Sequence, residues 1–227
     1  MQQQKTQDAV NLSFQGFRAF PHEVNLSFQG FRAFPHEVMH IPGLQSLFVN
    51  DNQMGAIPES IGPLMTALTD LDLSNNEILR LPNTVGDLTS LTILKILRLP
   101  NTVGDLTSLT ILKILRLPNT VGDLISLTIL KVSGNLLKTI PPTMGRILAL
   151  REMVVSNNPL EAPPMDVVQR GGLAVLQFLR SFHIGNRTGI LRMNRMSLVS
   201  LPLEMAVTER ITELDVSKNE IQVQLFR

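Results

Sequence analysis

The chain has 227 residues, of which 44% are hydrophobic and 17% are charged, a balance typical of a folded protein rather than a disordered one. Its 20 basic and 19 acidic residues leave a net charge of +1, which argues against nucleic acid or an anionic membrane as the main partner. The chain has no cysteine, which excludes disulfides, thiolate zinc sites and cysteine nucleophiles.

Residues 1–9 are polar and rich in glutamine, and we expect them to be disordered. They lack the apolar core of a signal peptide, and no apolar run in the chain is long enough to cross a bilayer. We therefore expect a cytoplasmic protein that does not insert into membranes.

A repeat begins near Val10 and organises most of the chain. The segment Leu44–Pro58 returns as Leu68–Pro82, with the shared pattern LxxLxLxxNxLxxLP. Asn52 and Asn76 are 24 residues apart. This spacing falls within the period of about 20–29 residues that is typical of a leucine-rich repeat.

The residue types within each repeat predict its path. The LxL alternation predicts a short strand with one buried face, and the following Asn is expected at the turn, where its amide can bond backbone groups of neighbouring coils. One unit cannot bury its own inner face, so units must stack. We predict an α/β solenoid with a parallel sheet on its concave face and short helical or extended arms outside. The expected structural asparagines are Asn52, Asn76, Asn135, Asn158 and Asn219.

Two stretches depart from this period. Residues 11–24 recur letter for letter as 25–38, a period of 14, and Ile78–Lys95 recurs twice with a period of 18. The third copy differs only at Ile125, and the copies lose five residues of the full unit, so that Leu99 and Leu117 fall where Asn would sit. We predict irregular short coils here, with weak strands or a bulged turn. Such copies are typical of recent duplication or of an error in assembling the gene.

The segment 36–40 matches the zinc-protease motif HExxH through His36, Glu37 and His40. That chemistry needs both histidines on one face of a long helix, with the glutamate as general base. Pro35 and Pro42 flank the segment, and the repeat pattern already explains it as a return arm of the convex side. We interpret the motif as coincidental and expect no metal, no cofactor and no catalytic residue.

Residues 165–187 interrupt the repeats. Leu173, Leu176, Leu179 and Phe182 recur near the helical period, which predicts an amphipathic helix across the end of the first repeat block. The expected organisation is a repeat block at 10–164, this helical segment at 165–187, and further repeats at 188–227 that are truncated because the chain ends without an evident cap.

The units resemble the pattern LPxxIGxLxxLxxLxLxxNxL of intracellular Ras-group leucine-rich-repeat proteins. Leu81–Leu88 and Ile57–Leu64 carry this pattern, and Asn158–Leu160 followed by Gly172–Arg180 is similar to the segment that often follows a repeat block there. The resemblance implies a curved solenoid that binds proteins, in some members small GTPases or phosphatase subunits.

The outward strand positions are the predicted partner-binding surface, because solenoids use their concave face. Phe48 is the expected aromatic anchor, and three lysines are expected to stack as a basic stripe that attracts an acidic partner. The full row is Asn11, Phe48, Asp72, Lys95, Lys113, Lys131, Val154, Arg192 and Asp215.

The predicted function is therefore non-catalytic protein–protein recognition as a cytosolic signalling scaffold or adaptor. Two alternatives stay open at this point. The chain could be the repeat region of a larger signalling enzyme, such as a kinase, phosphatase or cyclase, or the product of a misassembled gene.

Overall fold

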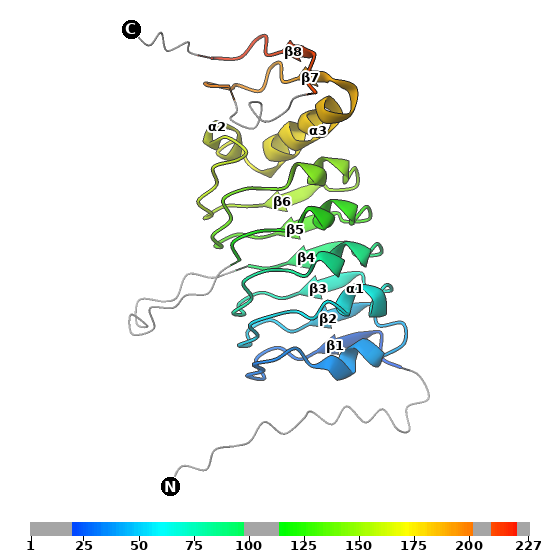
Figure 1. The fold of residues 1–227 in the computed structure, drawn as a ribbon. Coiled ribbons are helices and arrows are strands. Elements are labelled where there is room, and N and C mark those ends of the chain that lie inside the picture. Colours follow the sequence, from blue (N-terminus) through cyan, green and yellow to red (C-terminus); the bar gives the residue numbers. More distant parts are fainter. Residues whose placement is uncertain (1–19, 98–113, 202–209, 222–227) are drawn as a thin grey trace, which may run out of the picture.

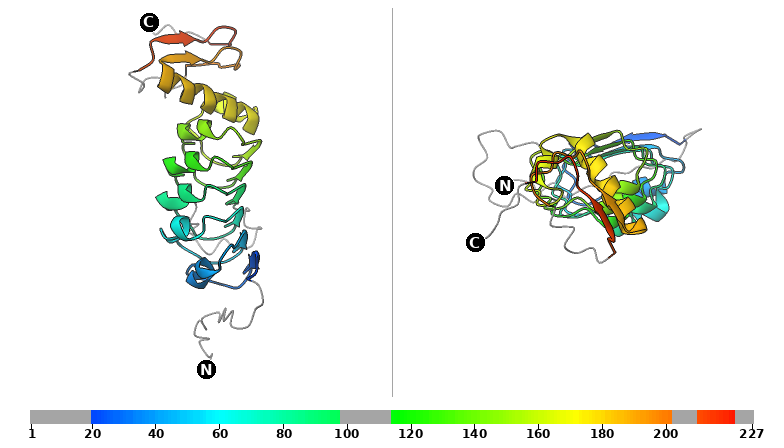
Figure 2. Two further views of the ribbon diagram at one scale, coloured as in Figure 1. Left: turned by 90° about the vertical axis from the view of Figure 1, so that its right-hand side faces the viewer. Right: turned by 90° about the horizontal axis from the view of Figure 1, so that it is seen from above.

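The computed structural model describes residues 20–97, 114–201 and 210–221, which form an elongated stack of coils (Figure 1). Each coil of the first block contributes a three-residue strand to one side and one short helix to the opposite side, as Figure 2 shows. The strands pair in chain order and parallel, giving a six-stranded sheet β1–β6 and a separate two-stranded sheet β7–β8. This is the predicted α/β leucine-rich-repeat solenoid.

The strands are β1 (Glu23–Asn25), β2 (Ser46–Phe48), β3 (Asp70–Asp72), β4 (Ile93–Lys95), β5 (Ile129–Lys131), β6 (Glu152–Val154), β7 (Ile190–Arg192) and β8 (Glu213–Asp215). The α-helices are α1 (Ile61–Leu64), α2 (Met165–Val168) and α3 (Gly172–Thr188), and the 3₁₀ helices are η1 (His36–His40), η2 (Asn83–Asp87), η3 (Asn119–Asp123) and η4 (Pro142–Arg146).

The middle residue of each strand points inward and builds the core. These residues stack along the sheet, and each fully buried leucine contributes about 1.5–3 kcal/mol relative to an exposed position. The stack is Val24, Leu47, Leu71, Leu94, Leu130 and Met153, all of them buried.

The helix side stacks closely because a glycine in each turn faces the next coil. A Cβ placed on Gly86 would lie 2.6 Å from the Thr120 carbonyl oxygen, and one on Gly122 would lie 2.5 Å from the Thr143 carbonyl oxygen. Each 3₁₀ helix follows a proline, whose fixed φ suits the entry to the turn.

The 18-residue copies do not form short coils, so that prediction is wrong. β4 pairs directly with β5, and Thr128 bonds the carbonyl of Thr92 from 36 residues away, whereas Thr92 bonds that of Thr69 from 23. Two copies thus supply a single coil, and Leu117 aligns with Leu81 rather than with an asparagine, because Arg80 bridges Arg116. The remaining residues of that coil, 98–113, including Leu99, lie outside the described part.

The first strand uses the second of the 14-residue copies. Glu23–Asn25 pairs with Ser46–Phe48 at a spacing of 23 residues, so Asn25 holds the position predicted for Asn11. Asn11 itself lies outside the described residues. With this register the first coil has regular length, because the duplicated residues precede it.

The predicted helix over residues 173–182 is confirmed as part of α3. It crosses the last coil of the first block: Gly172 lies against the Met153 backbone, and Gly145 of η4 lies against the Leu179 carbonyl. In Figure 1 the helix lies between β6 and β7, which do not pair. No helix in the described residues is long and apolar enough to span a membrane.

Candidate functional site

The outward side of β1–β6, here called the sheet face, presents two rows of side chains in strict register. Parallel pairing places residues of the same repeat position beside one another about 4.8 Å apart. One row is Asn25, Phe48, Asp72, Lys95, Lys131 and Val154, and the other is Glu23, Ser46, Asp70, Ile93, Ile129 and Glu152.

Phe48 is half-buried between Asn25 and Asp72. A partly exposed aromatic ring beside polar side chains can bury its remaining area against a partner at low conformational cost. This position fits the anchor role predicted for Phe48.

The described lysines of the sheet face do not form a basic stripe. The Lys95 Nζ lies 3.7 Å from Asp72 Oδ2, and the Lys131 Nζ lies 2.8 Å from Glu152 Oε1. Lys113 lies outside the described residues, and Lys95 and Lys131 are themselves neighbours through the β4–β5 pairing. Each described lysine is therefore balanced by a carboxylate, so the face offers paired charges of both signs.

Ile93 and Ile129 add an apolar element that the sequence reasoning missed. They lie side by side in the second outward row and are half-buried. The period-2 alternation of the strands could have identified them, because the residue before the inward leucine also faces outward.

Arg192 and Asp215 do not continue this surface. They face each other across β7 and β8, in the sheet that is separate from β1–β6. Hydrogen bonding from Ser217 holds the pKa of Asp215 below its ordinary value, and the charges of Arg192 and Lys218 act in the same direction. The predicted single row is therefore interrupted after Val154.

The asparagine ladder lies at the turn after the strands and holds the coils together. The Asn76 Nδ2 donates to the carbonyls of Val49, Leu73 and Ser74, and its Oδ1 accepts from the Met54 N–H. Equivalent bonds between coils confirm the other four predicted asparagines, Asn52, Asn135, Asn158 and Asn219.

Asn135 has an additional consequence for the 36-residue coil. Its Nδ2 donates to the Ile96 carbonyl at 2.7 Å, and its Oδ1 accepts from the Ile114 N–H at 3.2 Å. The same amide thus bonds the two points between which the extra residues are accommodated, and this keeps β4 and β5 adjacent.

The HExxH segment forms η1, a 3₁₀ helix of five residues that follows Pro35. With about three residues per turn, positions four apart lie on different faces, whereas zinc binding by this motif needs one face. Val38 and Met39 are buried, while the two histidines are exposed. Within the described residues, no group of three or more His, Asp or Glu side chains is placed to hold a metal ion.

One strand per coil, a stack of inward leucines and a ladder of buried turn asparagines define a leucine-rich-repeat solenoid. The chain is a leucine-rich-repeat protein. A family model described as Leucine Rich Repeat matches residues 67–88, the unit that contains β3.

A Drosophila melanogaster protein described as a leucine-rich repeat and calponin homology domain-containing protein is 43% identical over 51 residues. This match spans 22% of the present chain and only 6% of the fly protein.

Solved structures of similar repeat fold share little sequence with the chain. A leucine-rich-repeat protein of Leptospira interrogans is 21% identical with a TM-score of 0.41, over 84% of this chain and 53% of that one. A plant peptide hormone receptor, RGFR1 in complex with RGF2, is 22% identical with a TM-score of 0.41, over 56% and 18%. An internalin of Listeria monocytogenes is 21% identical with a TM-score of 0.39, over 52% and 30%.

Proposed function

We propose that this protein is a non-catalytic recognition module that binds a protein partner on its sheet face, as a scaffold or adaptor in cytosolic signalling. One observation carries the proposal: six adjacent strands present outward side chains in register, with the half-buried Phe48 at one end of the row. Repeat solenoids offer extended surfaces of this kind to protein partners.

The chemistry of the face supports a partner with both charges and apolar area. The ion pairs of Lys95 with Asp72 and of Lys131 with Glu152 can be exchanged for pairs with the partner, while Phe48 and the Ile93–Ile129 pair supply apolar contact. Recognition of this kind is polar with a few anchors, and its specificity depends on the register of the charges. On the resemblance described above, small GTPases and phosphatase subunits are the first partner classes to test.

The test compares the full chain with variants of the sheet face. The immobilised chain is incubated with purified small GTPases and phosphatase subunits and with a cytosolic extract, and bound proteins are quantified by mass spectrometry. Phe48→Ala is expected to reduce capture of the specific partner by about tenfold or more, because central aromatic anchors dominate interfaces. Asp72→Asn removes the charge while keeping an acceptor for the Ser74 N–H.

The matched control is Leu115→Ala, which removes an exposed leucine away from the sheet face. It is expected to leave capture unchanged. If Phe48→Ala and Asp72→Asn both leave every captured protein bound at unchanged affinity, the sheet face is not the binding surface.

A further inference from the structure

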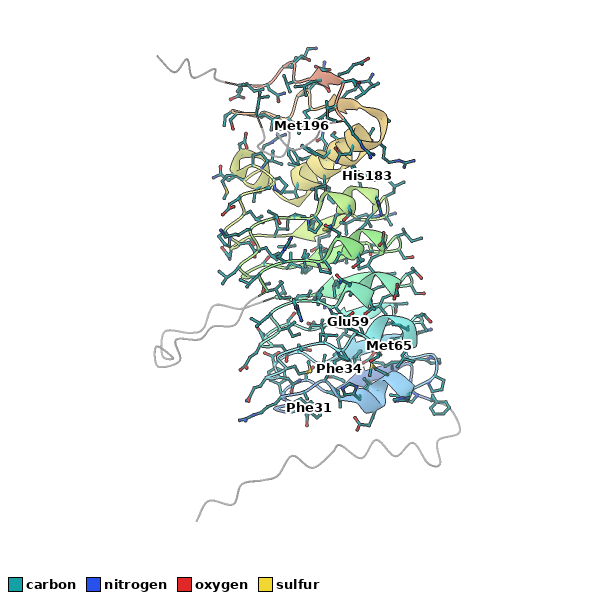
Figure 3. The ribbon with its side chains drawn as sticks, in the orientation of Figure 1. Phe31, Phe34, Glu59, Met65, His183 and Met196 are labelled. Atoms are coloured by element: carbon teal, nitrogen blue, oxygen red, sulfur yellow. The ribbon has the colours of Figure 1, made fainter. Side chains whose placement is uncertain are left out.

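A groove lies on the helix side, away from the sheet face, where α3 crosses η4. It has a volume of about 540 Å³ and is lined mainly by Arg146, Leu148, Arg180, His183, Ile184 and Arg187. Figure 3 shows His183 on the helix side, at the level where α3 meets the last coil of the first block. We call this feature the helix-side groove.

The walls of the groove are fixed by close backbone packing. Gly145 allows α3 to approach, because a Cβ at this position would collide with the Leu179 carbonyl and would lie 2.8 Å from the His183 Cβ. The Arg180 Nη2 lies 3.2–3.4 Å from three carbonyls of the loop after η4, those of Ile147, Leu148 and Leu150. The groove is therefore formed before any ligand arrives.

The charge of the groove is positive. Arg146 bonds Asp123 at 2.9 Å, whereas no carboxylate among the described residues pairs with Arg180 or Arg187. Burial lowers the pKa of His183 from its ordinary value, and the positive charges of Arg146 and Arg187 lower it further. An anionic group entering the groove would meet arginines that the described part of the chain leaves without an acidic partner.

An exposed apolar strip borders these arginines. Leu148 is 80% exposed and Ile184 is 56% exposed. Ile125, 63% exposed, holds the repeat position of Leu148 one coil earlier. It is the single difference between the third 18-residue copy and the other two, which have Thr89 and Thr107. Exposed apolar side chains beside arginines are typical of interaction surfaces.

We propose that the helix-side groove binds an acidic segment of a partner protein, with carboxylates on Arg180 and Arg187 and an apolar side chain over Leu148 and Ile184. The apolar strip favours a peptide over a nucleic acid, because a phosphate backbone would leave Leu148 and Ile125 uncovered. The near-neutral net charge of +1 points in the same direction. This site is independent of the sheet face, so the two can be tested separately.

The experiment measures fluorescence anisotropy of a labelled peptide in which leucine or phenylalanine alternates with pairs of aspartate or glutamate. We expect saturable binding to the full chain. Arg187→Glu should weaken it by about tenfold or more, because it replaces an attraction by a repulsion. Arg151→Glu, the same charge change at an exposed arginine outside the groove lining, should alter it less than about twofold.

Two further measurements locate the peptide. The His183 pKa, followed by NMR, should rise when the peptide binds, because a carboxylate offsets the two arginine charges. Phe48→Ala should leave peptide binding unchanged. Failure of the peptide to bind, an Arg187→Glu variant that binds normally, or a loss of binding on Phe48→Ala would overturn the proposal.

Probe specificity completes the test. A peptide with lysine in place of each acidic residue, and an acidic peptide with glycine in place of its apolar residues, should both bind at least about tenfold more weakly. Equal competition by short single-stranded DNA or by vesicles of anionic lipid would show a general anion site, and that result would overturn the assignment to a protein segment.

Discussion

At the scale of single residues, the turn asparagines do work that no apolar side chain could do. Asn76 is buried, and its amide bonds backbone groups of its own coil and of the preceding one. Without it, several carbonyls and one N–H would lose a partner in a dry turn, and the penalty for such groups exceeds the net gain of an ordinary hydrogen bond.

Asn76→Ala is accordingly expected to lower the free energy of unfolding by about 2–3 kcal/mol. Urea unfolding followed by circular dichroism measures this directly. The matched control is Asn83→Ala, at an exposed asparagine that begins η2, which should change stability by less than about 0.5 kcal/mol. Equal losses for the two variants would show that the ladder amide has no special role.

At the scale of elements, the spacing between coils on the helix side depends on glycine. The backbone of one coil occupies the space where the Cβ of the preceding one would lie, as Gly122 shows against the Thr143 carbonyl. The coils can stack at strand spacing on one side only if the opposite side is equally thin. The repeated glycine before the return arm is therefore a packing requirement.

Gly122→Ala is expected to destabilise the chain by about 1–3 kcal/mol through overpacking between η3 and η4. Gly55→Ala is the control, because a Cβ there has no neighbour within 4 Å. Thermal unfolding of the two variants should separate clearly. A Gly122→Ala variant as stable as Gly55→Ala would mean that the coils can shift apart without cost.

Sequence reasoning reached the regular parts of these elements because their requirements are local. An inward leucine, a turn asparagine and a helical period can each be recognised without knowing what lies beside them. The choice between identical copies is different, because Ile93–Lys95 and Ile111–Lys113 have the same letters. Only the turn that follows distinguishes them: β4 leaves room before Ile114 for the contact to Asn135, whereas a compressed coil does not.

At the scale of the whole molecule, lateral neighbours decide the character of both surfaces. The lysines predicted as a stripe are neutralised by carboxylates one coil away, Asp72 before Lys95 and Glu152 after Lys131. The helix-side groove joins Arg146 and Arg187 from different coils. Neither arrangement can be read from one repeat, because each depends on how successive coils are aligned.

The central claim is that two 18-residue copies make one coil, so that Lys95 and Lys131 are neighbours on the sheet face. Because the chain has no cysteine, introduced pairs can be tested one at a time by mild oxidation. Adjacent strands place Cα atoms about 4.8 Å apart, within disulfide range, whereas an intervening strand would separate them by about 10 Å.

The measurement is disulfide formation in the double variant Lys95→Cys with Lys131→Cys, and Lys95→Cys with Val154→Cys serves as the two-strand control. The account predicts rapid cross-linking of the first pair and none of the control. If Lys113→Cys instead cross-links with both Lys95→Cys and Lys131→Cys while the Lys95–Lys131 pair stays reduced, a separate short coil lies between them and the account is contradicted.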